Sequence, residues 1–214
     1  MTRAAAVRLS KAPVLALLVL VLAGCSSVIP GEGERPETYR VTAPDVAAAS
    51  AAPGARLVVE APSAAPGLAT DRIAVWRDPR HLQYYADSRW VEDAPEMVRA
   101  IMLEAFRSTR ALGAVGRRSV ELDPTHRLHT RLSDFESGYE AGAAIPTVRV
   151  EIAADLLAEP GGDVVGQTTA TARATPADES VGAVIAAFDA ATQRAVSDLV
   201  TWTVETIARG RTGA

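Results

Sequence analysis

The sequence predicts an α+β fold, a two-layer sandwich in which a mainly antiparallel sheet packs one face against two long amphipathic helices. Three observations predict it. Residues 147–156 alternate apolar and polar side chains, as a strand does when one of its faces is buried. Residues 98–112 and 181–207 instead repeat their apolar side chains with helical spacing. One apolar sheet face and two apolar helix stripes can bury their surfaces against one another.

Six segments read as strands: 38–41, 57–59, 73–76, 127–135, 147–156 and 164–174. The clearest pair is 147–156 with 164–174, because the intervening Pro160-Gly161-Gly162-Asp163 has hairpin composition. Segments 43–53 and 62–67 are rich in turn and loop residues. The residues expected to face the core from the fifth strand are Val148, Val150, Ile152, Ala154 and Leu156.

Both helices carry signals for where they begin. Asp93 offers an N-cap and Pro95 suits the first turn, and Gly113 is expected to end the first helix. The second helix is expected to begin near 178–180. We expect the first helix to bury Val98, Ile101, Met102 and Phe106 against the sheet face that carries Val148, Val150 and Ile152.

The amino terminus has the organisation of a secretory signal. Three cations, Arg3, Arg8 and Lys11, precede the apolar run 14–22, which is too short to cross a hydrocarbon core of about 30 Å. Leu22-Ala23-Gly24-Cys25 then resembles a bacterial lipobox. We therefore expect a lipoprotein signal peptide at 1–24 and a diacylglycerol thioether on Cys25, with palmitate among its acyl chains; an ordinary cleaved signal with a chance cysteine is the alternative. Ser26 follows where inner-membrane retention signals usually carry Asp, which favours the periplasmic side of the outer membrane.

Composition narrows the class of protein further. Processing removes every lysine and leaves an acidic chain without a basic cluster, which argues against a nucleic-acid partner. With its only cysteine acylated, the chain has no thiol for a disulfide and must depend on its core. Residues 25–37 are rich in Gly, Pro and Glu and are expected to form a flexible tether. Residues 38–214 are then expected to form a single periplasmic domain.

No pattern of catalytic or metal-binding residues stands out. His126 and His129 lie three apart, and on a strand this odd spacing directs them to opposite faces, so they cannot share an ion. A Gly-x-Ser-x-Gly nucleophile elbow is absent from the sequence. The acidic pairs at 92–93 and 178–179 sit at helix starts, where carboxylates stabilise the helix dipole. We expect no metal, no cofactor and no enzymatic activity.

The richest side-chain cluster is 82–90, directly ahead of the first helix. Tyr84, Tyr85, Arg89 and Trp90 either pack in the core at a strand-to-helix corner or form a partner surface, where these residue types are favoured. We favour a structural Trp90, because an indole just before a helix readily packs beneath it. Adjacent tyrosines in extended chain point to opposite sides, so at most one is expected in the core.

Several short motifs follow one another along the chain, framed by the lipobox and the closing helix: Leu57-Val58-Val59, Asp71-Arg72-Ile73-Ala74-Val75, Leu82-x-Tyr84-Tyr85, Arg89-Trp90 and Pro95-Glu96-Met97. In this order they resemble the ABC-type transport auxiliary lipoprotein family, the lipoprotein partners of MCE-domain lipid transporters that include the paraquat-inducible type. The chain departs from the family pattern at 44–53, which leaves the strand order open.

The resemblance implies a non-catalytic component of a lipid transport system between the two membranes. Its partners would be an MCE-domain protein and an ABC permease with its ATPase, and the membrane would be reached through the N-terminal lipid. A structural or assembly lipoprotein of the outer envelope is the main alternative, followed by an envelope-modifying enzyme. Whether the domain itself contacts lipid, and whether it forms a homo-oligomer, stays open.

Overall fold

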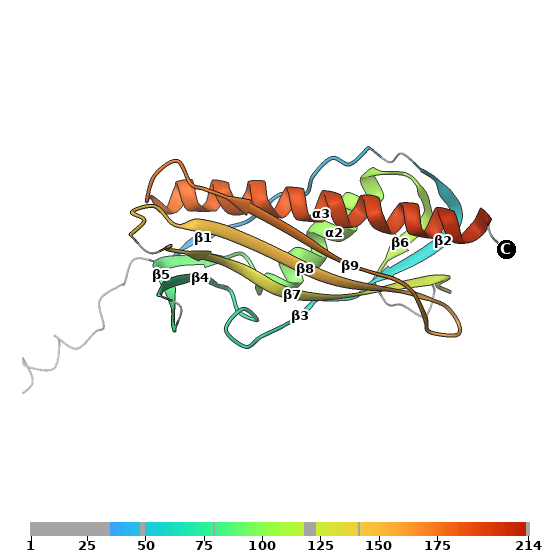
Figure 1. Ribbon diagram of the computed structural model, residues 1–214, viewed down its shortest axis with the longest axis horizontal. Helices are drawn as coiled ribbons and strands as arrows, with labels where there is room; N and C mark the ends of the chain where they lie inside the picture. The colour runs from blue at the N-terminus through green and yellow to red at the C-terminus, as the bar shows by residue number, and fades with distance from the viewer. Residues whose placement is uncertain (1–34, 48–49, 79, 118–122, 141, 213–214) are drawn as a thin grey trace, which may run out of the picture. The chain divides into compact units, whose positions relative to one another are not determined.

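The structure is a computed structural model that describes residues 35–47, 50–78, 80–117, 123–140 and 142–212. The chain divides into two units, Met1–Arg35 and Pro36–Ala214. The expected signal peptide, Cys25 and Ser26 lie outside the described residues, as does most of the expected tether. The second unit contains a mixed nine-stranded sheet with two helices, which confirms the α+β prediction (Figure 1). Neither helix in this described part has the length and apolar character needed to cross a membrane.

The elements follow the predicted order with several additions. The strands are β1 (Glu37–Tyr39), β2 (Ala52–Val59), β3 (Ser63–Ala64), β4 (Arg72–Asp78), β5 (His81–Trp90), β6 (Leu112–Gly116), β7 (His126–Gly138), β8 (Thr147–Ala158) and β9 (Asp163–Ala174). The helices are α2 (Ala94–Ser108) and α3 (Val181–Thr212). The predicted hairpin between β8 and β9 is present, whereas the predicted turn at 62–67 contains the two-residue strand β3.

The long strand β7 organises the sheet. Along one edge it pairs antiparallel with β8, which in turn pairs antiparallel with β9. Along its other edge β7 pairs in succession with β2, β3 and β4, and all three run parallel to it. Beyond these, β6 pairs parallel with β2, and β5 pairs antiparallel with β4 and parallel with β1. The extended hairpins are therefore antiparallel as predicted, and parallel pairing joins segments distant in sequence.

Helix α2 begins at the predicted cap but ends earlier than predicted. Asp93 occupies the N-cap position, where its backbone carbonyl rather than its side chain accepts the first amide hydrogen bonds. The prediction that Gly113 ends the helix is wrong, because Thr109 is the C-cap and Gly113 lies within β6. A Cβ at Gly113 would lie 2.2 Å from the carbonyl oxygen of Pro53. Glycine is thus required there by the close approach of β2 and β6.

Helix α3 follows a turn that its own side chains stabilise. The Asp178 carboxylate accepts from the Ser180 amide at 2.8 Å, and the Ser180 hydroxyl oxygen accepts from the Ala183 amide at 3.2 Å. The latter contact is that of an N-cap serine. Farther along α3, the Asp189 carboxylate accepts from both the amide and the hydroxyl of Thr42, at 2.6 and 2.9 Å. These bonds fix the segment after β1 against α3.

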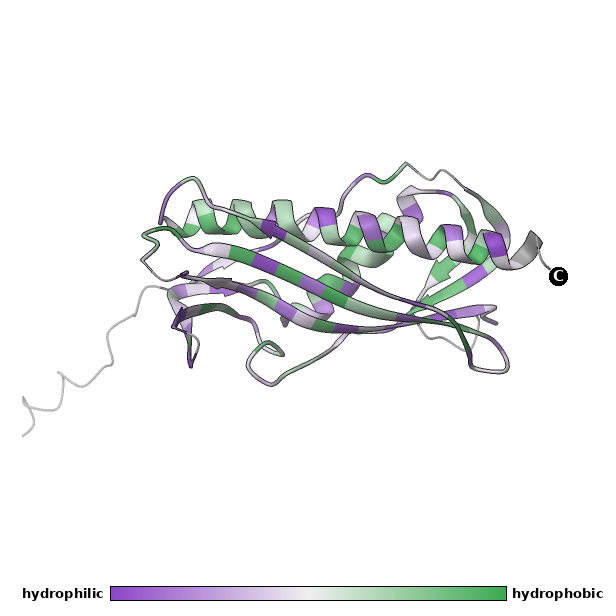
Figure 2. Cartoon of the chain, in the orientation of Figure 1, coloured by the Kyte–Doolittle hydropathy of each residue, from purple (hydrophilic) through white to green (hydrophobic). Residues whose placement is uncertain are grey.

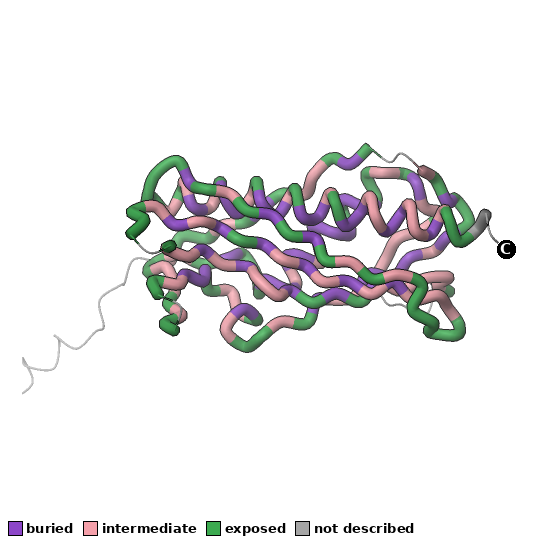
Figure 3. Tube along the Cα trace, viewed as in Figure 1, coloured by how far each residue is buried: buried purple, intermediate pink, exposed green. Residues whose placement is uncertain are grey.

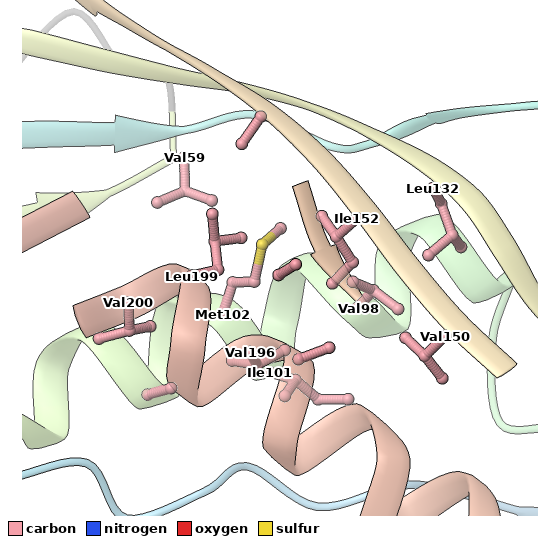
Figure 4. Close-up of a cluster of buried hydrophobic side chains, with 14 of the residues drawn as sticks. Val59, Val98, Ile101, Met102, Leu132, Val150, Ile152, Val196, Leu199 and Val200 are labelled. Atoms are coloured by element: carbon pink, nitrogen blue, oxygen red, sulfur yellow. The ribbon is translucent and has the colours of Figure 1, made fainter. Parts of the chain in front are cut away.

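The core lies between the helices and one face of the sheet. The alternation on β8 is visible as bands of opposite hydropathy, and its five predicted inward residues are all buried (Figure 2). Buried positions recur along the side of α3 that faces the sheet (Figure 3). Val98, Ile101 and Met102 of α2 join Val150 and Ile152 of β8 in one cluster, as predicted (Figure 4). Within it, α2 packs on α3 and β6 and to a lesser extent on β2, while α3 covers β8 and β9.

All the described residues of the hydrophobic core belong to the second unit, Pro36–Ala214. Every residue of the cluster falls between Val41 and Ile207, and the sheet and both helices lie within the same limits or close to them. A folded chain of this size can bury enough apolar surface to be stable by itself. We therefore expect the unit that begins at Pro36 to fold without the first 35 residues.

Candidate functional site

The cluster at 82–90 forms most of strand β5, which ends at Trp90 just ahead of α2. Tyr84 pairs with Ala74 of β4, but the next paired position on β5 is Arg89, opposite Arg72. The extra residues bulge out of the ladder, and Asp87 among them has a φ of +51°. After the bulge, Ser88–Trp90 pairs with β1. The irregular strand thus connects β4 to the first strand of the unit.

Trp90 lies in the core. Its side chain is 1% exposed, and its ring centroid lies 5.4 Å from that of Phe135 and 5.1 Å from that of Phe188. The two phenylalanine rings are 5.1 Å apart, which completes a three-ring cluster drawn from β5, β7 and α3. The Trp90 amide donates to the carbonyl of Asp71 at 2.7 Å. Such tilted and edge-to-face ring pairs stabilise a core beyond the area they bury.

Tyr85 is half-buried and packs against the core. Its hydroxyl lies 3.1 Å from the hydroxyl of Ser137, which is fully buried on β7 and donates to the Ala74 carbonyl at 3.4 Å. Burial is the main cause that raises the pKa of the Tyr85 phenol. The phenol is therefore neutral at physiological pH, and its contacts hold β5 to the inner sheet.

Tyr84 has different partners from its neighbour. Its hydroxyl donates to the carbonyl of Gly67 at 3.2 Å, and the guanidinium of Arg72 lies 3.7 Å above its ring. Arg89 pairs with Asp71 at 3.4 Å, and both side chains are more than a third exposed. Tyr84 and Arg89 therefore each contact neighbouring residues while part of each side chain stays accessible to solvent. Such partly exposed Tyr and Arg side chains are the types that partner surfaces favour.

The histidines make separate contacts. His126 lies 2.9 Å from the Thr125 hydroxyl, and burial lowers its pKa. His129 lies 3.1 Å from a Glu60 carboxylate oxygen, and Arg127 bridges Glu60 and Glu159 at 3.3 and 2.7 Å. Among the described residues, no group of three or more His, Cys, Asp and Glu side chains is arranged to hold a metal ion.

The His129–Glu60 pair lines a hollow of about 780 Å³ on the sheet, together with Ser63. This places a base, an acid and a hydroxyl in one surface depression, although no sequence motif joins Glu60, Ser63 and His129. The Ser63 hydroxyl donates to the backbone carbonyl of Thr130 at 3.5 Å. A hydrolase would instead need that hydroxyl to be hydrogen-bonded to the histidine.

A second hollow was also missed from the sequence. It has a volume of about 700 Å³ and lies beside the end of α2, where Arg107, Arg110 and Arg117 line it. Arg107 lies in the last turn of α2, Arg110 follows the C-cap of that helix, and Arg117 is the residue directly after β6. Their convergence depends on the connection between α2 and β6, which the Gly113 prediction placed incorrectly.

The match to known proteins identifies the family. Residues 39–200 match the sequence model of the family described as ABC-type transport auxiliary lipoprotein component. The chain belongs to this family. Its members are lipoproteins, so the protein is an envelope lipoprotein that acts as an auxiliary component of ABC-type transport. No curated protein matches the chain.

Solved structures share the fold of this auxiliary lipoprotein. A crystal structure of a Xanthomonas campestris protein of the DUF330 family is 28% identical, covers 83% of this chain and 100% of its own, and superimposes with a TM-score of 0.75. The crystal structure of an uncharacterized protein covers 81% of this chain and 97% of its own at 11% identity, with a TM-score of 0.54. The second likeness concerns the fold alone.

Proposed function

We propose that this auxiliary lipoprotein is anchored to the periplasmic side of the outer membrane and serves an MCE-type system that moves lipids between the two membranes. The family match over residues 39–200 carries the proposal, because it assigns the chain to ABC-type transport. The lipobox and Ser26 support the anchor and its membrane. The partners would be an MCE-domain protein and an ABC permease with its ATPase.

The domain division follows from the same proposal. Residues 1–24 would be the signal peptide, 25–37 the tether and 38–214 the periplasmic domain. The first described strand, β1, begins at Glu37 and pairs with β5, so the tether would join the folded unit beside the Tyr84–Trp90 segment. A partner that contacts this segment would approach the domain near the point where the tether enters.

Within that segment we assign different roles to neighbouring side chains. Trp90 and Tyr85 hold the fold, since their partners are Phe135, Phe188 and Ser137. Tyr84 and Arg89 contribute accessible surface that would meet the transporter. Replacing Arg89 there would remove a charged hydrogen-bond donor at small cost to the fold, because exposed ion pairs contribute at most about 1 kcal/mol.

The role is non-catalytic. Membership of a transport family supports this, as does the hydrogen bond that directs the Ser63 hydroxyl to a carbonyl rather than to His129. The energy for transport would come from the ATPase of the inner-membrane complex. The lipoprotein would contribute binding and positioning at the outer-membrane end.

Copurification tests the proposal. The tagged full-length lipoprotein is extracted from envelopes in detergent, and the proteins and lipids that accompany it are identified by mass spectrometry. We expect an MCE-domain protein and ABC subunits with the native chain, and less of both with Arg89→Ala. Arg131→Ala is the matched control, because Arg131 is also an exposed arginine on a strand. Recovery of surface-polymer or outer-membrane assembly proteins in their place would contradict the proposal and support the assembly role.

A further inference from the structure

The hollow beside the end of α2 gathers positive charge on an acidic protein. Arg107, Arg110 and Arg117 line it, against the carboxylates of Asp45 and Glu104. Arg107 is held in place by two donations to the Val115 carbonyl, both at 3.3 Å. In the described part of the chain, none of the three arginines lies within ion-pair distance of a carboxylate. The guanidinium groups of Arg110 and Arg117 are therefore available to an anion from solution, and Arg107 keeps one terminal nitrogen that does not donate to Val115.

The backbone at Arg110 supplies a second, independent observation. Arg110 follows the C-cap Thr109 and has a φ of +53°, while its amide donates to the Arg107 carbonyl at 3.2 Å. Helices commonly end with glycine in this left-handed position, because a Cβ is disfavoured there. The chain therefore retains an arginine where glycine would be more stable. Strain of this kind is characteristic of functional positions.

The composition of the hollow indicates the class of anion. Guanidinium groups are planar and donate paired hydrogen bonds, which match the oxygens of a phosphate group. The volume of about 700 Å³ exceeds what a phosphate ion needs, and Ala100 and Leu103 add apolar surface to the lining. A phosphate attached to a larger, partly apolar body would therefore use both parts of the hollow.

We propose that this hollow binds the phosphate group of an anionic glycerophospholipid, with Arg110 and Arg117 as direct ligands and Arg107 as a fixed third donor. The glycerol and the first part of the acyl chains would lie against Ala100 and Leu103. The site lies apart from the Tyr84–Trp90 segment and does not depend on which transporter the lipoprotein serves. Its failure would leave the proposed partners untouched, because copurification tests those separately.

Calorimetric titration of the unit Pro36–Ala214 tests the site with monomeric short-chain lipids. We expect binding of dihexanoyl phosphatidylglycerol and much weaker binding of inorganic phosphate. Arg110→Gly should weaken lipid binding roughly tenfold, the loss typical of one charged hydrogen bond. The same variant should unfold at an equal or higher temperature, because glycine relieves the left-handed strain. Arg117→Gln should also weaken binding, whereas Glu104→Gln should strengthen it.

Two matched variants control for indirect effects. Asp87→Gly relieves a comparable left-handed residue, φ +51°, outside the hollow, and Arg131→Gln removes one exposed positive charge elsewhere. Both should bind phosphatidylglycerol as the native unit does. Equal affinity for inorganic phosphate and for the lipid would overturn the lipid assignment. Absence of lipid binding, or unchanged binding in both Arg110→Gly and Arg117→Gln, would overturn the site.

Discussion

Trp90 and Arg89 are neighbours in β5, yet their replacement should have very different effects on stability. The Trp90 side chain is 1% exposed and contacts two phenylalanine rings. An aromatic side chain buries roughly 150–250 Å². At about 25 cal/mol per Å², its loss corresponds to about 4–6 kcal/mol. Trp90→Ala should therefore lower the free energy of unfolding by about 4 kcal/mol or more, near the top of the range for buried aromatics.

The expected contrast with Arg89→Ala is large enough to measure. In a protein of this size 1 kcal/mol changes the melting temperature by about 2–4 °C, so Trp90→Ala should lower it by about 8 °C or more. The Arg89–Asp71 pair is exposed on both sides, at 47% and 39%, so Arg89→Ala should cost no more than about 1 kcal/mol. Urea unfolding of the unit Pro36–Ala214, followed by far-ultraviolet circular dichroism, gives the free energy of unfolding of each variant. Thermal unfolding followed by the same signal gives the melting temperatures.

A conservative variant keeps this prediction testable if the alanine variant fails to fold. Trp90→Phe retains an aromatic ring beside Phe135 and Phe188 and should lose less stability than Trp90→Ala, in a fully cooperative transition. Equal stability of the native unit and Trp90→Ala would refute the three-ring cluster as a stabilising feature. A loss on Arg89→Ala as large as that on Trp90→Ala would refute the division of roles within β5.

Four further variants have expected outcomes that follow from the sequence and the structure. Cys25→Ser should abolish labelling by a palmitate analogue, and label that persists in Cys25→Ser would refute a lipid anchor at this position. Ser26→Asp should retain the label but move the protein toward the inner membrane on a sucrose gradient. Phe106→Ala should destabilise the unit by about 3–5 kcal/mol, because Phe106 is fully buried, and an unchanged urea midpoint would contradict the packing of α2. Burial raises the pKa of Glu136, so its ionisation opposes folding as pH rises through that raised value. Glu136→Gln should therefore raise the melting temperature at neutral pH. The gain should shrink toward acidic pH, where the native carboxyl is neutral in both the folded and the unfolded state. An effect that does not change with pH would show that the charge of Glu136 does not cause it.

Local patterns predicted the elements whose partners lie nearby in sequence. The alternation at 147–156 and the hairpin composition at 160–163 identify β8 and β9, because an antiparallel hairpin is specified by adjacent residues. The helical spacing of Val98, Ile101 and Met102 likewise identified the buried face of α2. Apolar periodicity predicts which side chains of an element are buried, and the predicted apolar positions on β8 and α2 are buried in the structure.

Long-range contacts explain what the patterns could not predict. β2, β3 and β4 pair parallel with β7 across more than 60 residues, and local composition contains no information on such pairing. Gly113 was misread because glycine has two distinct uses: ending a helix and admitting a close neighbour. At Gly113 the neighbour is the Pro53 carbonyl, which only the folded sheet brings near. The bulge in β5 between Tyr84 and Trp90 could not be predicted either, because it depends on the pairing of β5 with both β4 and β1.

The two surfaces proposed to be functional each contain a residue other than glycine in the left-handed backbone conformation, which glycine usually occupies. Asp87 and Arg110 are the described non-glycine residues with positive φ, and they lie in the β5 bulge and at the end of α2. Each would be more stable as glycine by the backbone alone. In β5, the bulge moves the chain from pairing with β4 to pairing with β1 beside the accessible Arg89. At α2, the left-handed residue is itself one of three converging arginines. Asp87→Gly and Arg110→Gly each relieve a left-handed residue, so both variants should be at least as stable as the native unit. Only Arg110→Gly should weaken phosphatidylglycerol binding, because only Arg110 lines the hollow.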